Sequence, residues 1–185
     1  MPFQIAKLDI KDPLKCLTAL RKSYKNCFLL ESATRGDLRL SRYSFLGFDP
    51  ETIIEIKGKE AKINGKKTKI TDTFKLLDKY SKIYKCNSFF PFCGGLVGYI
   101  SYDSIRYIEK IPDTTHDDIK LPDMFFGLYK DGIVIDRFAN TTYYFSLNGF
   151  RLDEVEKIIK NGENDSNISH LTGIQKLKSN ITKEE

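Results

Sequence analysis

NCFLLESATRGDLRLSRYSFLGFDP, residues 26–50, is the stretch of sequence that decides the fold. It contains two segments rich in aliphatic and aromatic residues, 27–32 and 42–48, on either side of a polar loop that includes Gly36 and Asp37. Short apolar segments bounded by glycine, aspartate and serine are typical of β-strands. We therefore predict two strands that can pair with each other in one sheet.

The segments that follow extend this pattern. Thr52–Lys57 forms another candidate strand, and Ala61–Ile63 runs into Asn64-Gly65. Asn-Gly is favoured in two-residue hairpin turns because both residues tolerate positive φ. Further strand candidates follow at 124–130, 132–137 and 142–147. Strands joined by such short turns predict a largely antiparallel sheet.

Four segments have helical patterns. In the first, Asp12 supplies a cap, Pro13 suits the first helical position, and apolar residues recur every three or four positions as far as Tyr24. The others are Asp72–Tyr84, Tyr102–Glu109 and Leu152–Ile159, the last with Gly162 as its expected C-terminal stop. Because strands outnumber helices, we predict an α+β fold, with a largely antiparallel, sandwich-like sheet and a few flanking helices.

Composition indicates a globular protein. Of its 185 residues, 41% are hydrophobic and 30% are charged, which excludes wholesale disorder. We expect residues 1–162 to form one domain and the polar residues 163–185 to form a linker. The apolar runs are much shorter than the ~20 residues that span a bilayer, and the N-terminus lacks a secretory signal pattern. We expect a cytoplasmic protein without a membrane partner.

Cysteine and histidine usage gives no metal-site pattern. The cysteines, at 16, 27, 86 and 93, form no Cys-x-x-Cys pair, and the only histidines are His116 and His170. Tetrahedral zinc sites require closely spaced ligands of these types. We expect reduced, buried thiols and no metal or cofactor bound by this chain.

The net charge of +5 raises the alternative of a basic RNA-binding module. The lysines between Lys57 and Lys69 alternate with isoleucine and alanine, which is more typical of a solvated strand face. No zinc finger and no aromatic RNA-binding signature is present. We therefore expect no nucleic-acid partner and keep the RNA-binding module as an alternative.

Motifs for catalysis are weak. Gly94, Gly95 and Gly98 lack the spacing and the lysine of a phosphate-binding loop, so we predict that they allow close approach of another backbone or ring. His116 lies in a charged loop, and adjacent carboxylates such as Asp117 and Asp118 point apart on a strand. We predict no catalytic residue.

Binding chemistry is better supported at the edges of the first two strands. Glu31 and Ser32 end one segment, and Arg42 begins the next. A carboxylate beside a hydroxyl suits an ammonium group, and a guanidinium suits a carboxylate, so the three could hold a zwitterionic amino acid. The competing interpretation, a surface ion pair between Glu31 and Arg42, is favoured by these residues alone.

Four blocks of the sequence resemble the N-terminal region of anthranilate synthase component I. They occur in the same order over nearly the whole chain, which makes the resemblance specific. The blocks are Phe28–Ser32, Ser41–Pro50, Pro91–Tyr99 with the Tyr102-Asp103 and Arg106-Tyr107 pairs that follow, and Leu121–Tyr129.

The resemblance implies a function. In that family, the large subunit converts chorismate to anthranilate with ammonia from a glutamine amidotransferase partner, component II, and L-tryptophan inhibits it by feedback. The matching residues Leu30, Glu31, Ser32 and Arg42 are then the expected tryptophan contacts, which favours ligand binding over the ion pair.

The resemblance also implies what this chain lacks. The family's C-terminal chorismate-binding domain, which holds Mg²⁺, follows the matched region, so we expect this chain to be inactive alone. Aminodeoxychorismate synthase component I, of the folate pathway, shares the architecture and remains the alternative within the resemblance. Glu31 and the block around Arg42 look more like the anthranilate enzyme.

Overall fold

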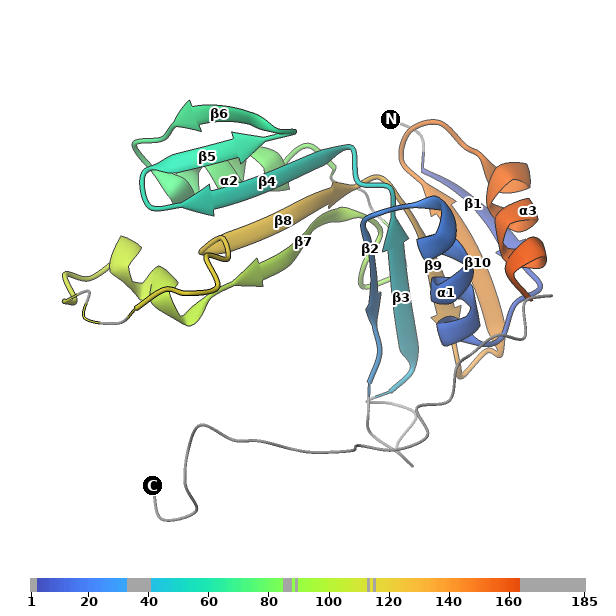
Figure 1. The fold of residues 1–185 in the computed structure, drawn as a ribbon. Helices are drawn as coiled ribbons and strands as arrows, with labels where there is room; N and C mark the ends of the chain where they lie inside the picture. The colour runs from blue at the N-terminus through green and yellow to red at the C-terminus, as the bar shows by residue number, and fades with distance from the viewer. Residues whose placement is uncertain are drawn as a thin grey trace, which may run out of the picture.

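We describe the protein from a computed structural model, which defines residues 3–32, 41–84, 88, 90–112, 114 and 116–163. Within these residues, ten strands form two five-stranded antiparallel sheets, which meet at a corner (Figure 1). The first sheet has the order β1 (Gln4–Leu8), β10 (Thr141–Ser146), β9 (Asp131–Asp136), β3 (Tyr43–Phe48), β2 (Cys27–Leu30). The second has the order β6 (Lys66–Lys69), β5 (Glu60–Ile63), β4 (Thr52–Lys57), β8 (Met124–Tyr129), β7 (Gly95–Ile100).

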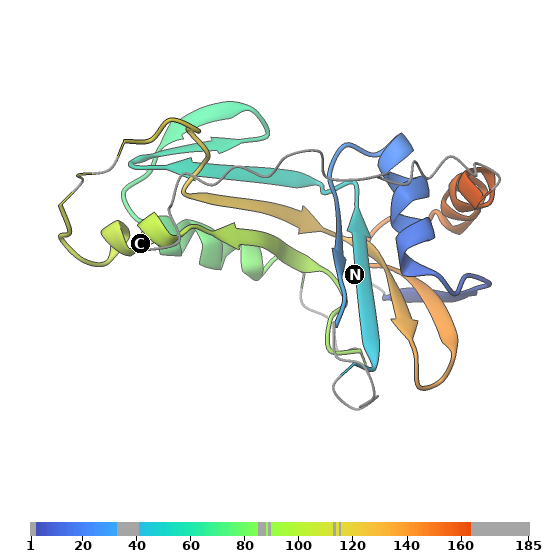
Figure 2. The same cartoon turned by 60° about the horizontal axis from the view of Figure 1, so that its bottom comes forward.

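Two segments of the chain pass through both sheets. The first forms β3 and then β4, and the second forms β8 and then β9 (Figure 2). These segments pair with each other in both sheets, β3 with β9 and β4 with β8. Between the sheets the backbone N–H of Glu51 donates to the carbonyl of Leu128, at 2.9 Å. The sheets are therefore joined by continuous, paired backbone.

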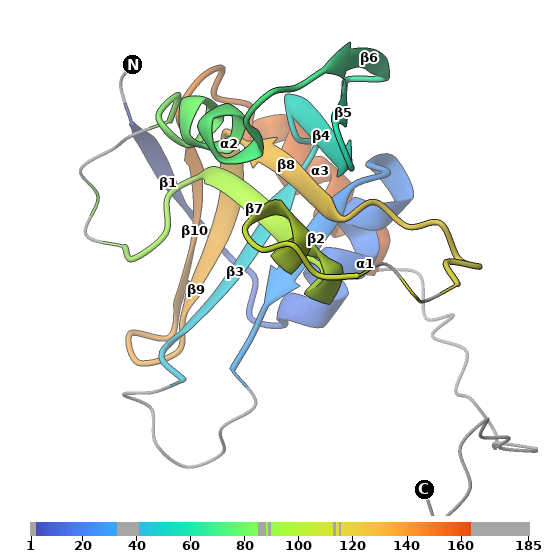
Figure 3. The same ribbon diagram turned by 90° about the vertical axis from the view of Figure 1, so that its left-hand side faces the viewer.

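Helices cover one face of each sheet. Helices α1 (Pro13–Ser23) and α3 (Leu152–Glu163) lie side by side on the first sheet, and α2 (Thr73–Ser81) lies against the second (Figure 3). A short 3₁₀ helix, η1, spans Tyr102–Tyr107. The core between α1, α3 and the first sheet includes Cys16, Leu20, Leu46, Phe48, Ile133, Tyr144, Val155 and Ile159. The apolar faces predicted for α1 and α3 are thus buried against the first sheet, whereas Phe74 of α2 and Tyr102 of η1 are exposed.

Local sequence signals place the helix starts and one turn as predicted. The Asp12 carboxylate accepts from the N–H groups of Leu14 and Lys15, at 2.9 and 3.2 Å, with Pro13 in the first helical position. In the hairpin between β5 and β6, Asn64 and Gly65 have φ of 46° and 82°. The cap and the Asn-Gly turn are both confirmed.

The close approach predicted for the glycine-rich segment is confirmed at Gly94 and Gly98 but is wrong for Gly95, where a Cβ would meet no atom within 4 Å and φ is 116°. A Cβ placed on Gly98 of β7 would lie 1.9 Å from the carbonyl oxygen of Phe125 on the neighbouring strand. No side chain fits at that distance, so this strand pair requires glycine here.

Strand β1 and the end of α3 differ from the sequence prediction. Strand β1 was not predicted, because it is a short edge strand whose positions are mostly exposed, so its sequence has no clear apolar alternation. Gly162 does not end α3, which continues to Glu163. Instead, a Cβ on Gly162 would lie 2.3 Å from Cβ of Ala19, so the missing side chain lets α3 pack closely on α1.

The α+β class with largely antiparallel sheets is confirmed. In the described part of the chain, no helix has both the length and the apolar character needed to cross a membrane. Cys16 and Cys27 are reduced thiols, but Cys93 is disulfide-bonded, so the expectation of reduced thiols is wrong for Cys93. Cysteine spacing alone does not reveal which cysteines come together in the fold. The predicted linker after residue 163 and His170 lie outside the described residues.

Candidate functional site

Charged side chains gather where β2 and β9 end and β3 begins. Leu30, the last residue of β2, is paired with Phe45, and Tyr43, the first residue of β3, is paired with Asp136 at the end of β9. These three strand ends lie at the same edge of the first sheet (Figure 1). The antiparallel topology therefore brings Glu31, which follows β2, to the same edge as Arg42, which precedes β3.

Arg42 is held by Asp136. Its Nε lies 3.1 Å from both carboxylate oxygens, and its Nη2 lies 2.7 Å from Oδ2. Oδ1 also accepts from the backbone N–H groups of Phe138 and Ala139, at 3.0 and 3.1 Å. The hydrogen bond from Arg42 keeps the pKa of Asp136 below its ordinary value, and the same bond raises the pKa of Arg42. Both groups are therefore charged at neutral pH.

Glu31 is held by Arg137, the residue that follows Asp136. Nη2 of Arg137 donates to Oε1 of Glu31 and to the buried hydroxyl of Ser44, the latter at 3.1 Å. The backbone N–H of Arg137 donates to the carbonyl of Arg42, at 2.8 Å, and so continues the ladder between β9 and β3. Consecutive residues at the end of β9 thus bind the two opposite charges singled out from the sequence.

The structure brings Glu31 and Arg42 to one edge but does not pair them with each other. The surface ion pair considered from the sequence is replaced by separate pairs with Arg137 and Asp136. Leu30, the last residue of β2, is half exposed. Ser32 is partly buried at the end of the described segment.

Asp136 and Arg137 were not singled out from the sequence. The available signal was an Asp-Arg pair directly after the buried Ile133–Ile135 run of β9. Nothing in that pattern indicates that β9 lies next to β3. The two strands are far apart in the sequence, where Arg42 and Asp136 are separated by 94 residues.

Two aromatic rings flank the Arg42 guanidinium. Its central carbon lies 4.7 Å from the ring centre of Tyr43 and 5.5 Å from that of Phe138. The Phe138 ring is 71% exposed. A guanidinium between aromatic faces is restrained by cation–π attraction, so Arg42 presents its charge in a defined direction.

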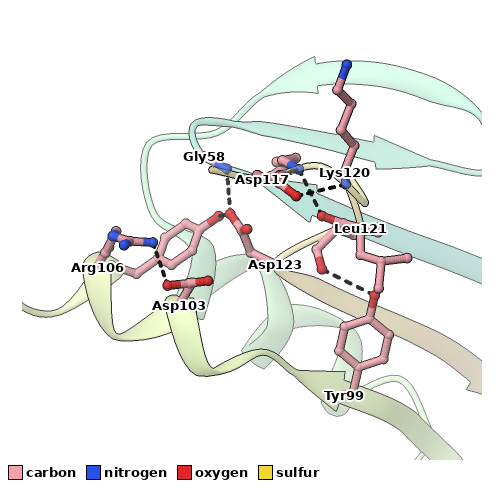
Figure 4. A network of polar contacts seen from close by, with 11 residues as sticks. Gly58, Tyr99, Asp103, Arg106, Asp117, Lys120, Leu121 and Asp123 are labelled. Atoms are coloured by element: carbon pink, nitrogen blue, oxygen red, sulfur yellow. Dashed lines mark hydrogen bonds and ion pairs between the residues drawn. The ribbon is translucent and has the colours of Figure 1, made fainter. Parts of the chain in front are cut away.

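A second polar cluster lies at the far end of the second sheet (Figure 4). There Oδ2 of Asp123 accepts from the N–H of Gly58 and the hydroxyl of Tyr107, at 2.9 and 2.7 Å. Burial and this hydrogen bond raise the pKa of Tyr107 well above its ordinary value. The cluster borders a cavity of about 550 Å³, lined also by Lys57, Lys59, Asp103 and Arg106.

The other carboxylates of this cluster accept hydrogen bonds from groups of the protein. Asp117 accepts from Lys57 and from the N–H of Lys120, and Asp103 accepts from Arg106. Within the described residues, no group of three or more histidine, cysteine, aspartate or glutamate side chains could hold a metal ion. These residues therefore do not fit the Mg²⁺ that the resemblance implies for the longer enzyme.

Comparison with known proteins identifies the family. A family model described as chorismate binding enzyme matches residues 25–185. The chain belongs to the chorismate-binding enzyme family. Anthranilate synthase component 1 of Methanothermobacter marburgensis is 35% identical over 157 residues, which cover 83% of this chain and 33% of that protein. The same component of Leptospira biflexa is 32% identical over 167 residues, covering 89% of this chain and 35% of that protein.

This member of the chorismate-binding enzyme family spans about a third of the length of these relatives, 33% and 35%. A solved structure, anthranilate synthase component I from Streptococcus pneumoniae TIGR4, superposes with a TM-score of 0.55 at 24% identity. The match covers 71% of this chain and 31% of that one, and it supports the fold.

Proposed function

We propose that this chain is the effector-binding N-terminal part of anthranilate synthase component I and that it binds L-tryptophan at the edge formed by β2, β3 and β9. Chorismate chemistry and Mg²⁺ binding belong to a C-terminal domain of a longer protein, and component II, a glutamine amidotransferase, supplies ammonia. This part carries no catalytic site of its own. The observation that carries the proposal is the placement of Glu31 and Arg42, with opposite charges, at one edge of the sheet.

The chemistry of a free amino acid fits this edge. Its ammonium and carboxylate groups sit on one carbon atom, so a recognition site needs an anionic acceptor and a cationic donor close together. Glu31 offers a carboxylate for the ammonium, and the guanidinium of Arg42, beyond its bonds to Asp136, offers a further N–H group for the ligand's carboxylate. Ser32 adds a hydroxyl next to Glu31 in the sequence, and Leu30 adds an exposed aliphatic side chain.

The names of the relatives support the assignment to anthranilate synthase component I. Each of the two relatives compared is named anthranilate synthase component 1, and this chain spans about a third of their length, 33% and 35%. A part of this size suits a regulatory role within a larger subunit. Regulation requires that tryptophan prefer one global state of that subunit, with a coupling free energy of typically ~1–3 kcal/mol.

The basic RNA-binding alternative has less support. Lysines of the 57–69 region pair with acidic neighbours, Lys62 with Glu55 at 3.5 Å and Lys67 with Glu60 at 4.0 Å. Paired lysines on an edge are typical of a solvated strand face. RNA binding through the backbone would weaken steeply as salt rises, and a gel shift at low salt tests for it.

Enzyme kinetics test the proposal. In the longer protein supplied with ammonium, anthranilate formation is followed by fluorescence while tryptophan is titrated. We expect Glu31→Ala and Ser32→Ala to raise the tryptophan concentration that halves the rate, each measured against its own uninhibited rate. Arg21→Gln, an exposed arginine on α1, is the control and keeps the wild-type sensitivity. Unchanged inhibition in both variants would reject the site.

A further inference from the structure

Two consecutive residues, Asp136 and Arg137, bind the two charged groups of the proposed site. Asp136 forms a bidentate pair with Arg42, and Arg137 pairs with Glu31. Among the described residues the site therefore contains two ion pairs, and of their four charged groups only Glu31 and Arg42 were assigned to the ligand. The other two need a role.

We propose that Asp136 and Arg137 are positioning residues that orient Arg42 and Glu31 for an amino-acid ligand, an inference that rests on the proposed function. Each binds only one side of its partner. The side-chain hydrogen bonds of Arg42 to described residues come from Nε and Nη2, and the side-chain donor to Glu31 within that part of the chain reaches Oε1. Since Nη1 of Arg42 and Oε2 of Glu31 form no hydrogen bond to the described residues, we assign these two atoms to the carboxylate and the ammonium of the ligand.

The positioning residues are themselves held rigidly. They lie at the end of β9, the central strand of the first sheet, and the backbone of Arg137 is bonded to the carbonyl of Arg42. The carboxylate of Asp136 is only 5% exposed and is fixed by two backbone N–H groups in the turn that follows β9. A side chain held in its binding geometry loses less conformational entropy when the ligand arrives, which strengthens binding.

Ser44 gives Arg137 its direction. Nη2 of Arg137 bonds to both the Ser44 hydroxyl and Glu31, and Ser44 is fully buried on β3. Arg137 therefore connects the interior of the sheet to the exposed carboxylate of Glu31, whose side chain is 37% exposed. Without Arg137, Glu31, which follows an edge strand, would lose its side-chain hydrogen-bond donor among the described residues.

The opposite model is that Arg137 competes with the ligand. In that case the guanidinium would occupy the place of the ligand's ammonium on Glu31, and its removal would strengthen binding. The two models predict effects of opposite sign, so one titration separates them.

The experiment uses the longer protein with its amidotransferase partner and measures the tryptophan concentration that halves anthranilate formation, relative to the uninhibited rate of each variant. The variants are Arg137→Gln, Asp136→Asn, Glu31→Gln and the Glu31→Gln/Arg137→Gln double, with Arg21→Gln as the charge-matched control. We expect Arg137→Gln and Asp136→Asn each to raise that concentration by about tenfold. Arg137→Lys keeps the charge without the planar fork and should fall between wild type and Arg137→Gln.

The double variant identifies the route of action. If Arg137 acts through Glu31, adding Arg137→Gln to Glu31→Gln causes no further loss of inhibition, whereas independent effects would multiply. If Arg137→Gln acted by unfolding the protein, it would instead lower the melting temperature both in the wild type and in the Glu31→Gln variant. Arg137→Lys, a milder change, keeps the test available if Arg137→Gln does not fold.

The outcomes separate this inference from the proposed function. Wild-type enzyme that tryptophan does not inhibit would overturn both. Normal inhibition that Glu31→Gln weakens, together with unchanged or tighter inhibition in Arg137→Gln, would overturn only the positioning role. Multiplicative loss in the double variant would also overturn it.

Discussion

Arg151 reaches the fully buried carboxylate of Asp131 and places its Nε 2.7 Å from Oδ2. The pair joins the segment before α3 to the first residue of β9. The hydroxyl of Ser146 donates to Oδ1 of the same carboxylate, at 2.6 Å. Burial raises the pKa of Asp131, and these two partners oppose that shift. The pair therefore stabilises the first sheet at the strand that carries the positioning residues.

Arg151→Ala should destabilise the protein strongly. It leaves Asp131 buried without its cation and also removes the ion pair with Asp49. Breaking a buried pair in this way costs about 3–5 kcal/mol. Urea unfolding at pH 7 measures the loss, with Lys82→Ala as the control, since the Lys82–Asp78 pair is exposed on both sides and is worth at most ~1 kcal/mol. Similar losses in both variants would contradict this account of Asp131.

Asp136 should make stability sensitive to acid. The Arg42 hydrogen bond lowers its folded-state pKa below the ordinary value of 3.8. An acid with a depressed pKa contributes stability above its unfolded-state pKa and loses it as pH falls through the folded-state pKa. Asp136→Asn should therefore cost stability at pH 7, and its difference from wild type should shrink below about pH 3.8. A difference that stays constant over pH 7 to 3 would contradict the assigned shift.

Gly162→Ala tests the packing of α3 on α1. In an exposed helix, this change stabilises by roughly 1 kcal/mol because alanine favours the helix. Here the new Cβ would lie 2.3 Å from Cβ of Ala19, so we expect destabilisation instead. The double variant Ala19→Gly/Gly162→Ala should recover part of the loss, because it moves the missing methyl to the other helix. Thermal unfolding measures the loss in Gly162→Ala and the recovery in the double variant. A higher melting temperature in Gly162→Ala alone would mean that the helices are not in close contact.

Features set by neighbouring residues could be predicted from the sequence. The Asp12-Pro13 helix start and the Asn64-Gly65 turn depend on backbone geometry within a few residues, and both were located correctly. Strand β1 could not be predicted, because its exposed positions carry little apolar pattern and its partner β10 is far along the chain.

In the candidate site, too, residues next to recognisable segments could be predicted, and contacts between distant strands could not. Glu31 and Arg42 could be named from residue chemistry and from the resemblance, since each borders a recognisable apolar segment. Their partners could not, because Asp136 and Arg137 meet them only through the pairing of β9 with β3. Strand order is set by the packing of the whole sheet, which a single sequence does not display. The disulfide at Cys93 was missed for a similar reason.

A structure of the longer protein crystallised with tryptophan tests the central claim most directly. The account predicts the amino acid at the edge of β2, β3 and β9, with its ammonium against Oε2 of Glu31 and its carboxylate against Nη1 of Arg42, while Asp136 and Arg137 keep their pairs. Tryptophan bound elsewhere, or touching neither Glu31 nor Arg42, would contradict it.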